Sequence, residues 1–509
     1  MKCIYCGADN PIRAEHCQQC GKKIVVDFDT LAESVHEDAA VARREKLSGY
    51  LKWAILALLI IGALIFGIND MFDKPLVYDG SGLPALTVPG SVALDVPEVQ
   101  KKYVDPRPTP ALPEARITAF GYRSSPIKDK LRAANKGDIA PPGLRAPQVA
   151  IGEGLRWLSG HQISDGCWPV TIEPLVWTQQ NVKEYAWGSV GVTSLVLLAY
   201  FGEGETWLGD DPGRKKSQYA DRILKGIKFL AQAQDPATGM FRVYNIAQHV
   251  FEDGAGGATH FMYNQGMATL AMCEAAGISG DPYLREVAQK GTDYIVKAQT
   301  AAGGWNYRGE TQGDSDTSLS AWQVQALCAA REIGLKVPPE AYSKALEMYQ
   351  KATQAEGYVR YLADKEDKED RNRISLCGVA LMMRQLLGDD GRGPTVKKLA
   401  SVLVEQAKPD YTKPFWGRDW KPEQPKNDDG ARAKYDPYLI YFATYGLFFM
   451  GGSTWDQWHD AEKKAVIEMQ SADGGWHTND TWTCCGGTSY ATALSILTLQ
   501  VYYRIQSSY

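Results

Sequence analysis

The chain has 509 residues, which is too long for one compact core, so two or more structural units are expected. Its formal net charge is -5 and its pI is near 5.9, which excludes a protein whose bulk is a basic nucleic-acid-binding surface. The 49 glycines and 14 tryptophans are typical of many short helices joined by turns, with aromatic-lined surfaces.

The chain begins with two Cys-x-x-Cys pairs, ten residues apart and each followed by a glycine: Cys3 with Cys6, and Cys17 with Cys20. Four thiolates suit tetrahedral Zn²⁺, and the metal supplies the folding free energy that so small a unit lacks. We therefore predict a structural zinc ribbon over residues 1–24, which docks a cytoplasmic protein partner and is not catalytic. Two disulfides are the alternative, but they conflict with a cytoplasmic location.

A polar helix is predicted over 28–49, followed by the uncharged run "WAILALLIIGALIFGI" within 50–69. This run is long enough to span a bilayer as a helix. Basic residues precede it and Asp70 and Asp73 follow it, so the positive-inside rule places the N-terminus in the cytoplasm. We predict a single-pass membrane protein whose remaining chain is extracytoplasmic, or periplasmic.

Residues 74–146 have little helical periodicity and are rich in proline, as in "VDPRPTPALPEARI" and "IAPPGLRAP". This composition predicts a semi-extended extracytoplasmic linker.

From 147 to 509 one pattern recurs six times: a helix that ends near a Gln, a Gly-aromatic turn, and a second helix. The turn aromatics are Trp168, Phe241, Trp305, Tyr358, Trp416 and Trp476. The second helices, such as "VGVTSLVLLAYF" and "PYLIYFATYGLFFMGG", are more apolar than the first and are predicted to form an inner layer. We therefore predict an all-α fold in which six helical hairpins close into an (α/α)6 toroid. An open solenoid would need polar end caps, and the last helix is as apolar as the others.

Repeated Gln followed by Gly-x-Trp resembles the α/α toroid of squalene cyclases and protein prenyltransferases. The chain is similar to membrane-anchored bacterial prenyltransferase/squalene-oxidase repeat proteins, here with an N-terminal zinc ribbon. The resemblance covers 147–509 and implies the fold, whereas the motifs say little about chemistry.

Class II terpene cyclases protonate an alkene with an Asp of an Asp-x-Asp-Asp-Thr motif, which requires a strong acid in a dry cavity. The stretch Asp314-Ser315-Asp316-Thr317 occupies the corresponding place, before an inner helix. Aligned on its first Asp, the resemblance implies Asp316 as the acid with Asp314 in support, but the last Asp is missing. Aligned on the Thr, Ser315 takes the acid's place and the acid is lost.

The same residues have a structural interpretation. Ser and Thr recur at what looks like the same early position of four inner helices, and Ser, Thr or Asp there caps free helix N–H groups. We favour this capping role over the acid. The residues concerned are Thr193-Ser194, Thr317-Ser318, Ser375 and Thr488-Ser489.

A second polar cluster, "ATHFMYNQG", offers His260 as a candidate catalytic residue of a polysaccharide-acting α/α barrel, with a polar helix entrance as the alternative. Aromatic and polar side chains of the inner helices and turns are expected to line a binding cavity. They are Trp305, Trp322, Tyr263, Asn264, Tyr438, Tyr441 and Tyr490.

No cofactor is predicted in the toroid, since we find no Asp-x-Cys with a matching downstream His for a prenyltransferase-type zinc site. Two functional hypotheses follow. The toroid is a module that binds a lipid, glycan or protein, or it is an enzyme that acts on a terpene or a polysaccharide.

Ring closure would make the sixth repeat a neighbour of the first. We therefore expect Cys167 to approach Cys484 or Cys485, where a disulfide would be possible outside the cytoplasm. A vicinal bond between Cys484 and Cys485, or free thiols, are the alternatives. Cys273, Cys328 and Cys377 fall within apolar helices and are predicted to be buried thiols.

Overall fold

The chain divides into two compact units, and the larger one comprises Pro97–Leu208 and Lys215–Ser507. The computed structural model describes 117–118, 147–170, 188–208, 217–246, 248–252, 261–365, 374–389, 393–409, 436–477, 483–504 and 506–507, together with Gln19 and Cys20. At 117–118, 483–485, 502–503 and 506–507 the description covers the backbone alone. The predicted zinc ribbon (apart from Cys20), polar helix and transmembrane helix lie outside these residues, as does almost all of the linker.

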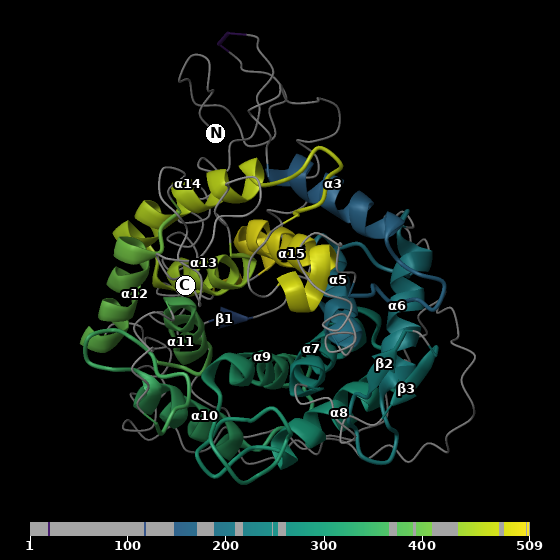
Figure 1. Ribbon diagram of the computed structural model, residues 1–509, viewed down its shortest axis with the longest axis horizontal. Helices are drawn as coiled ribbons and strands as arrows, with labels where there is room; N and C mark the ends of the chain where they lie inside the picture. The colour runs from purple at the N-terminus through teal and green to yellow at the C-terminus, as the bar shows by residue number, and fades with distance from the viewer. Residues whose placement is uncertain are drawn as a thin grey trace, which may run out of the picture. The chain divides into compact units, whose positions relative to one another are not determined.

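In the described part of the chain, six helices form an inner ring (Figure 1). Each inner helix packs against the next in chain order, and the last packs against the first, which closes the circle. They are α5 (Ser189–Gly202), α7 (Phe261–Ser279), α9 (Thr317–Glu332), α11 (Ile374–Leu386), α13 (Pro437–Met450) and α15 (Thr483–Leu499).

A second set of six helices lies outside the first, and each precedes its inner partner in the chain. They are α3 (Pro147–Gly160), α6 (Ala220–Ala233), α8 (Pro282–Lys297), α10 (Pro339–Ala352), α12 (Pro394–Gln406) and α14 (Gly452–Glu468). Every residue of α5 is buried, whereas α6 buries one stripe of apolar residues and exposes the rest. This difference confirms the predicted inner and outer layers, and the six hairpins are confirmed with it.

In four of the hairpins, the recurring Gln ties its turn to the next hairpin. Gln299 Nε2 donates to Gly303 O of its own turn at 2.8 Å and to Ala341 O of the following outer helix at 2.9 Å. Gln162 and Gln234 bond in the same way to Arg222 O and Val287 O. The Gln470 amide donates to Ala150 O of α3 at 2.8 Å and joins the sixth hairpin to the first.

The Gly-aromatic part of the motif has its own geometric reason. Gly303 has φ +94°, and a Cβ there would lie 2.1 Å from Lys344 O, so only glycine permits this approach between turn and helix. The buried indole of Trp305 then donates to Ile295 O of its own outer helix at 2.7 Å. Trp168 and Trp476 repeat that bond to Leu158 O and Val466 O.

Short elements complete the unit. β2 (Val243–Asn245) and β3 (Val250–Glu252) form an antiparallel hairpin between α6 and α7. β1 (Ile117–Thr118), within the predicted linker, pairs antiparallel with β4 (Gln506–Ser507), which follows α16 (Val501–Arg504). Within the described residues we find no helix of the length and apolarity needed to cross a bilayer.

Candidate functional site

Asp316 is the N-cap of α9. Its Oδ1 accepts hydrogen bonds from the Ser318 and Leu319 amides at 2.8 and 2.9 Å, and from the Ser318 hydroxyl at 2.6 Å. Asp at an N-cap commonly satisfies amides of the first helical turn in this way. The carboxylate that the cyclase resemblance marks as an acid is therefore bonded to its own helix.

Backbone bonds from two turns fix this cap in place. The Asp316 amide donates to Trp305 O at 2.9 Å, and the Thr317 amide donates to Tyr361 O at 3.0 Å. The Thr317 hydroxyl adds bonds to Arg360 O and Tyr361 O. The start of α9 is thereby held between the turns of the third and fourth hairpins.

The second carboxylate oxygen differs from the first. Asp316 is only 1 % exposed, and its Oδ2 has no hydrogen-bond partner among the described residues. A buried polar atom without a partner destabilises a fold by about 1–3 kcal/mol. Asp316 thus combines a capping oxygen with an unsatisfied one.

Four tyrosines surround this helix entrance. Tyr263 shares a hydrogen bond of 2.8 Å with the Ser318 hydroxyl, and Tyr349 and Tyr438 donate to Thr317 O and Ser318 O at 2.8 and 3.3 Å. Burial raises the pKa of Tyr307, Tyr349 and Tyr438, and the charge of Asp316 raises each pKa further. These three phenols therefore stay neutral at physiological pH.

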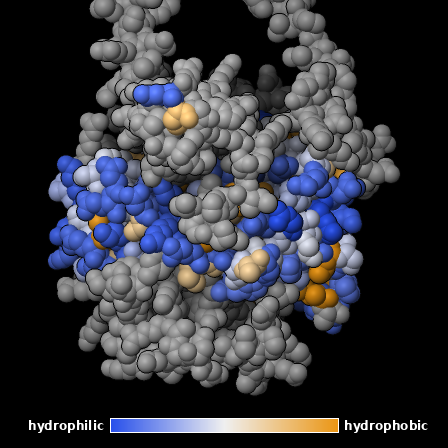
Figure 2. Space-filling model, turned by 90° about the horizontal axis from the view of Figure 1, so that it is seen from above, coloured by the Kyte–Doolittle hydropathy of each residue, from blue (hydrophilic) through white to orange (hydrophobic). Residues whose placement is uncertain are grey.

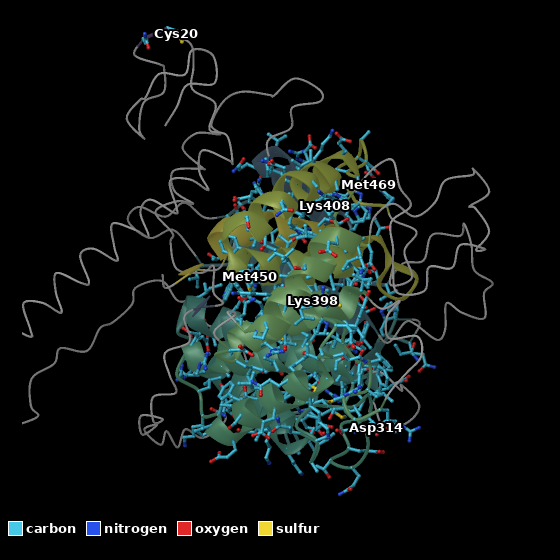
Figure 3. The ribbon with its side chains drawn as sticks, turned by 90° about the vertical axis from the view of Figure 1, so that its left-hand side faces the viewer. Cys20, Asp314, Lys398, Lys408, Met450 and Met469 are labelled. Atoms are coloured by element: carbon cyan, nitrogen blue, oxygen red, sulfur yellow. The ribbon has the colours of Figure 1, made fainter. Side chains whose placement is uncertain are left out.

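Asp314 does not join Asp316. Its carboxylate pairs with Lys365 Nζ at 2.5 Å, and its side chain is 36 % exposed. In the side view of Figure 3, Asp314 lies at the lower right of the molecule. An ion pair this exposed contributes little stability. Because Asp314 pairs with Lys365, it does not act as the supporting carboxylate that the cyclase motif would place beside Asp316.

An aromatic cluster lies beyond this entrance and is made of Trp322 on α9 and Tyr438, Tyr441 and Phe442 on α13. The Trp322 ring stacks on Tyr441 at 5.8 Å and meets Phe442 edge-on at 5.3 Å. Because α11 separates α9 from α13 in the ring, these rings meet across its interior. The Trp322 indole N–H is buried and has no partner among the described residues.

The other predicted cavity residues have different surroundings. Trp305 packs within its own hairpin, as described above, and Asn264 Oδ1 accepts from the Gly191 amide at 2.9 Å, which joins α7 to α5. Tyr490 is buried on α15. His260 lies outside the described residues. The structure therefore brings Trp322, Tyr438 and Tyr441 together, and it places Tyr263 beside Asp316.

The expected repeated cap needs a correction. Thr193 does not cap α5, whose N-cap is Gly188 without a side-chain bond. Its hydroxyl accepts instead from the Trp168 amide at 3.0 Å, one turn inside the helix. Ser320 and Thr492 do the same for Trp305 and Trp476. The residue equivalent to Thr193 is thus Ser320, not Thr317, and these hydroxyls hold turns rather than helix ends.

The described cysteines carry no disulfide. Cys167, Cys273, Cys328 and Cys377 are buried thiols, and burial raises the pKa of Cys167 to about 12. Cys20 is exposed. Cys3, Cys6 and Cys17 lie outside the described residues, as do the side chains of Cys484 and Cys485. The predicted zinc ligands and the predicted clasp at Cys167 therefore stay predictions.

Sequence reasoning missed two charged clusters that join distant segments. Arg504 of α16 is buried, pairs with Glu274 of α7 and donates to Leu198 O of α5 at 2.7 Å. Asp165, in the turn after α3, binds Tyr244 and His249 of the β2–β3 hairpin. In the sequence, Asp165 stands directly before the turn glycine Gly166, but nothing near it indicates which residues it would bind. In the part of the chain that is described, no three His, Cys, Asp or Glu side chains are arranged to hold a metal ion.

No protein-family profile matches the sequence, and no curated protein is similar to it. Among solved structures, the chain is similar to the type II terpene cyclase MstE from Scytonema in complex with geranylgeranyl dihydroxybenzoate, with 11 % identity and a TM-score of 0.43 over 70 % of this chain and 97 % of that one. It is also similar to a glycoside hydrolase family 76 mannosidase from Bacteroides thetaiotaomicron, with 13 % identity and a TM-score of 0.44 over 70 % and 98 %. With similarity this low, the case for the toroid rests on the closed helix contacts of this chain.

Proposed function

We propose that the toroid is a binding module for a polar partner, a glycan or a polar protein surface, and that Asp316 serves as a helix cap. The observation that carries this proposal is the bonding of Asp316 Oδ1 to three donors of its own helix. All three donors belong to residues of α9 itself, so this oxygen is used in capping the helix.

The packing of the interior supports the same proposal. Trp322 and Phe442 have no exposed surface, and Tyr438 and Tyr441 are each 4 % exposed. These four side chains are almost entirely covered by neighbouring atoms, which argues against a substrate bound against them. We therefore propose that the partner binds to the outer surface of the ring.

The polarity of that surface narrows the class of partner. Among the described residues, Val250 is the one large hydrophobic side chain that is exposed. Among the coloured residues of the face that Figure 2 presents, most are hydrophilic and a few are hydrophobic. Lipid-binding surfaces and obligate protein interfaces offer larger apolar patches. We therefore favour a polar ligand over a lipid for this surface.

The wider arrangement is part of the proposal. A membrane helix over 50–69 would anchor the chain, a zinc ribbon at 1–24 would dock a cytoplasmic protein, and the toroid would meet its partner on the other side of the membrane. The sequence patterns described above support this arrangement.

One observation favours the alternative, a terpene-cyclase-like enzyme. Asp316 Oδ2 and the Trp322 N–H are both buried and have no partner in the part of the chain that the structure describes, and a ligand between α9 and α13 would satisfy them. On this alternative the interior opens to admit a substrate and Asp316 donates a proton.

Substitutions at Asp316 separate the two roles. Asn caps helices as well as Asp does, so Asp316→Asn should keep the stability and the binding of the module. Asp316→Ala should lose about 1–2 kcal/mol, measured by urea unfolding. Native mass spectrometry of the full chain extracted from membranes tests the interior. A bound apolar molecule that Asp316→Asn leaves unconverted, while the wild type converts it, would establish the enzyme instead.

A further inference from the structure

A cluster of ionisable side chains lies on the outer surface, apart from Asp316. His249 Nδ1 is 2.5 Å from Asp165 Oδ2, and the Tyr244 hydroxyl donates to the same oxygen. The Ser164 hydroxyl donates to Oδ1 at 3.1 Å. Asp165 belongs to the turn of the first hairpin and His249 to the β2–β3 loop before α7, so the fold joins residues 84 positions apart.

The hydrogen bonds fix the state of the imidazole. Those from Tyr244 and His249 lower the pKa of Asp165, so this side chain is a carboxylate at neutral pH. A carboxylate only accepts, so in the neutral imidazole Nδ1 carries the hydrogen and Nε2 carries the lone pair. The His249 side chain is 64 % exposed, and its Nε2 has no partner among the described residues, so water reaches this nitrogen.

The backbone at His249 is strained. Its φ is +56°, and no other non-glycine residue among those described has a positive φ. At such a position Gly or Asn folds with less strain, and residues held in this region concentrate at functional sites. The left-handed backbone at His249 is therefore one observation in favour of a functional role for this residue.

The sixth hairpin provides an internal comparison. Asp473 holds the same place before its turn glycine as Asp165 does, and it bonds His477 Nε2 at 3.0 Å. Asp473 also accepts from the Trp157 indole at 2.9 Å, and His477 packs edge-on against Trp157. His477 is half as exposed as His249 and takes part in packing between hairpins. The pair of Asp473 and His477 is thus structural, and it serves as a matched control.

We propose that His249, positioned by Asp165 and Tyr244, is the general base of a surface site that hydrolyses small, water-accessible carboxylic esters. Nε2 takes a proton from water while the water oxygen bonds to the acyl carbon. The imidazolium then returns that proton to the alkoxide oxygen as the acyl C–O bond breaks. Ester and water give a carboxylic acid and an alcohol, and His249 ends in its starting state. The carboxylate of Asp165 stabilises the imidazolium formed between the two steps. The site is independent of the binding proposed above.

The test uses the full chain in detergent with 4-nitrophenyl acetate as the probe ester. The wild type should hydrolyse it at least ten times faster than His249→Gly. Asp165→Asn should lower the rate at least tenfold. His477→Gln should leave the rate unchanged.

Thermal unfolding separates catalysis from a structural role. His249→Gly relieves the positive φ, so its Tm should equal or exceed that of the wild type while the rate falls. A lower Tm in His249→Gly would mean that the imidazole stabilises the contact between the hairpins, and this result would overturn the proposal. Equal rates for the wild type and His249→Gly would overturn it as well.

Discussion

Glu462 of α14 is a carboxyl group held out of water. It is 2 % exposed, and burial raises its pKa from 4.5 to about 8, so the folded protein keeps it protonated at pH 7. The unfolded chain releases this proton near pH 4.5. Between these two values the folded state binds more protons than the unfolded state, so this residue makes stability fall as pH rises.

We predict that Glu462→Gln has the stability of the wild type near pH 4 and greater stability at pH 9. Gln keeps the shape of the neutral acid and cannot ionise. Urea unfolding at pH 4, 7 and 9 measures the difference, with Glu468→Gln on the exposed face of the same helix as the control. Parallel pH profiles for wild type and Glu462→Gln would contradict the raised pKa.

At the scale of the elements, the seam between the sixth and first hairpins depends on Gln470. We predict that Gln470→Ala loses about 1–3 kcal/mol of stability, because it removes bonds to Ala150 O and Gly474 O. Gln299→Ala removes the same two kinds of bond inside the ring and is the matched control. Urea unfolding should give similar losses. No loss for Gln470→Ala beside a clear loss for Gln299→Ala would mean that the seam is open in solution.

The C-terminal helix α16 is held by the buried pair of Arg504 and Glu274. Arg504→Ala leaves Glu274 buried without its arginine, and we expect it to cost about 3–5 kcal/mol. Arg504→Met combined with Glu274→Leu should recover most of this loss, because a well-packed apolar pair replaces a buried ion pair at little cost. Chemical denaturation measures both variants. A double variant as unstable as Arg504→Ala would point to a role beyond the pair.

The hairpins could be predicted because their signals are local: Gln, Gly and Trp fall within a few residues of one another, and the apolar pattern separates inner from outer helices. The cap at Asp316 could be predicted for the same reason, since an N-cap bonds residues two and three positions ahead. The match of Thr193 to Thr317 was wrong because it was based on the Thr-Ser pair that both positions share. The hydroxyl that accepts from the turn aromatic lies about one turn after the start of the inner helix. In α9 the residue at that position is Ser320, which is therefore the counterpart of Thr193.

Contacts between distant segments gave no comparable signal. His249 reaches Asp165 only because a hairpin inserted before α7 extends to the preceding turn. Arg504 meets Glu274 across 230 positions. A single sequence carries the residue types of such pairs but not their three-dimensional partners.

For the whole molecule, the predicted zinc ribbon is the part most open to direct test. The full chain purified in detergent should contain about one zinc ion per chain by elemental analysis, as four thiolates around one tetrahedral ion require. Cys20→Ser should lower the zinc content sharply and leave the unfolding of the toroid unchanged. Zinc content that does not change in Cys20→Ser would contradict the assignment of these ligands.

Closure of the ring also has a consequence for how the chain is made. The bond from Gln470 to Ala150 spans 320 positions, so the first hairpin finds its neighbour on one side only when the last has been synthesised. Until then the nascent chain exposes the apolar flank of α3 and α5, and contacts of such long range form slowly. Chains released before α15 is complete should therefore be substrates for chaperones or proteases, even with five of the six hairpins in place.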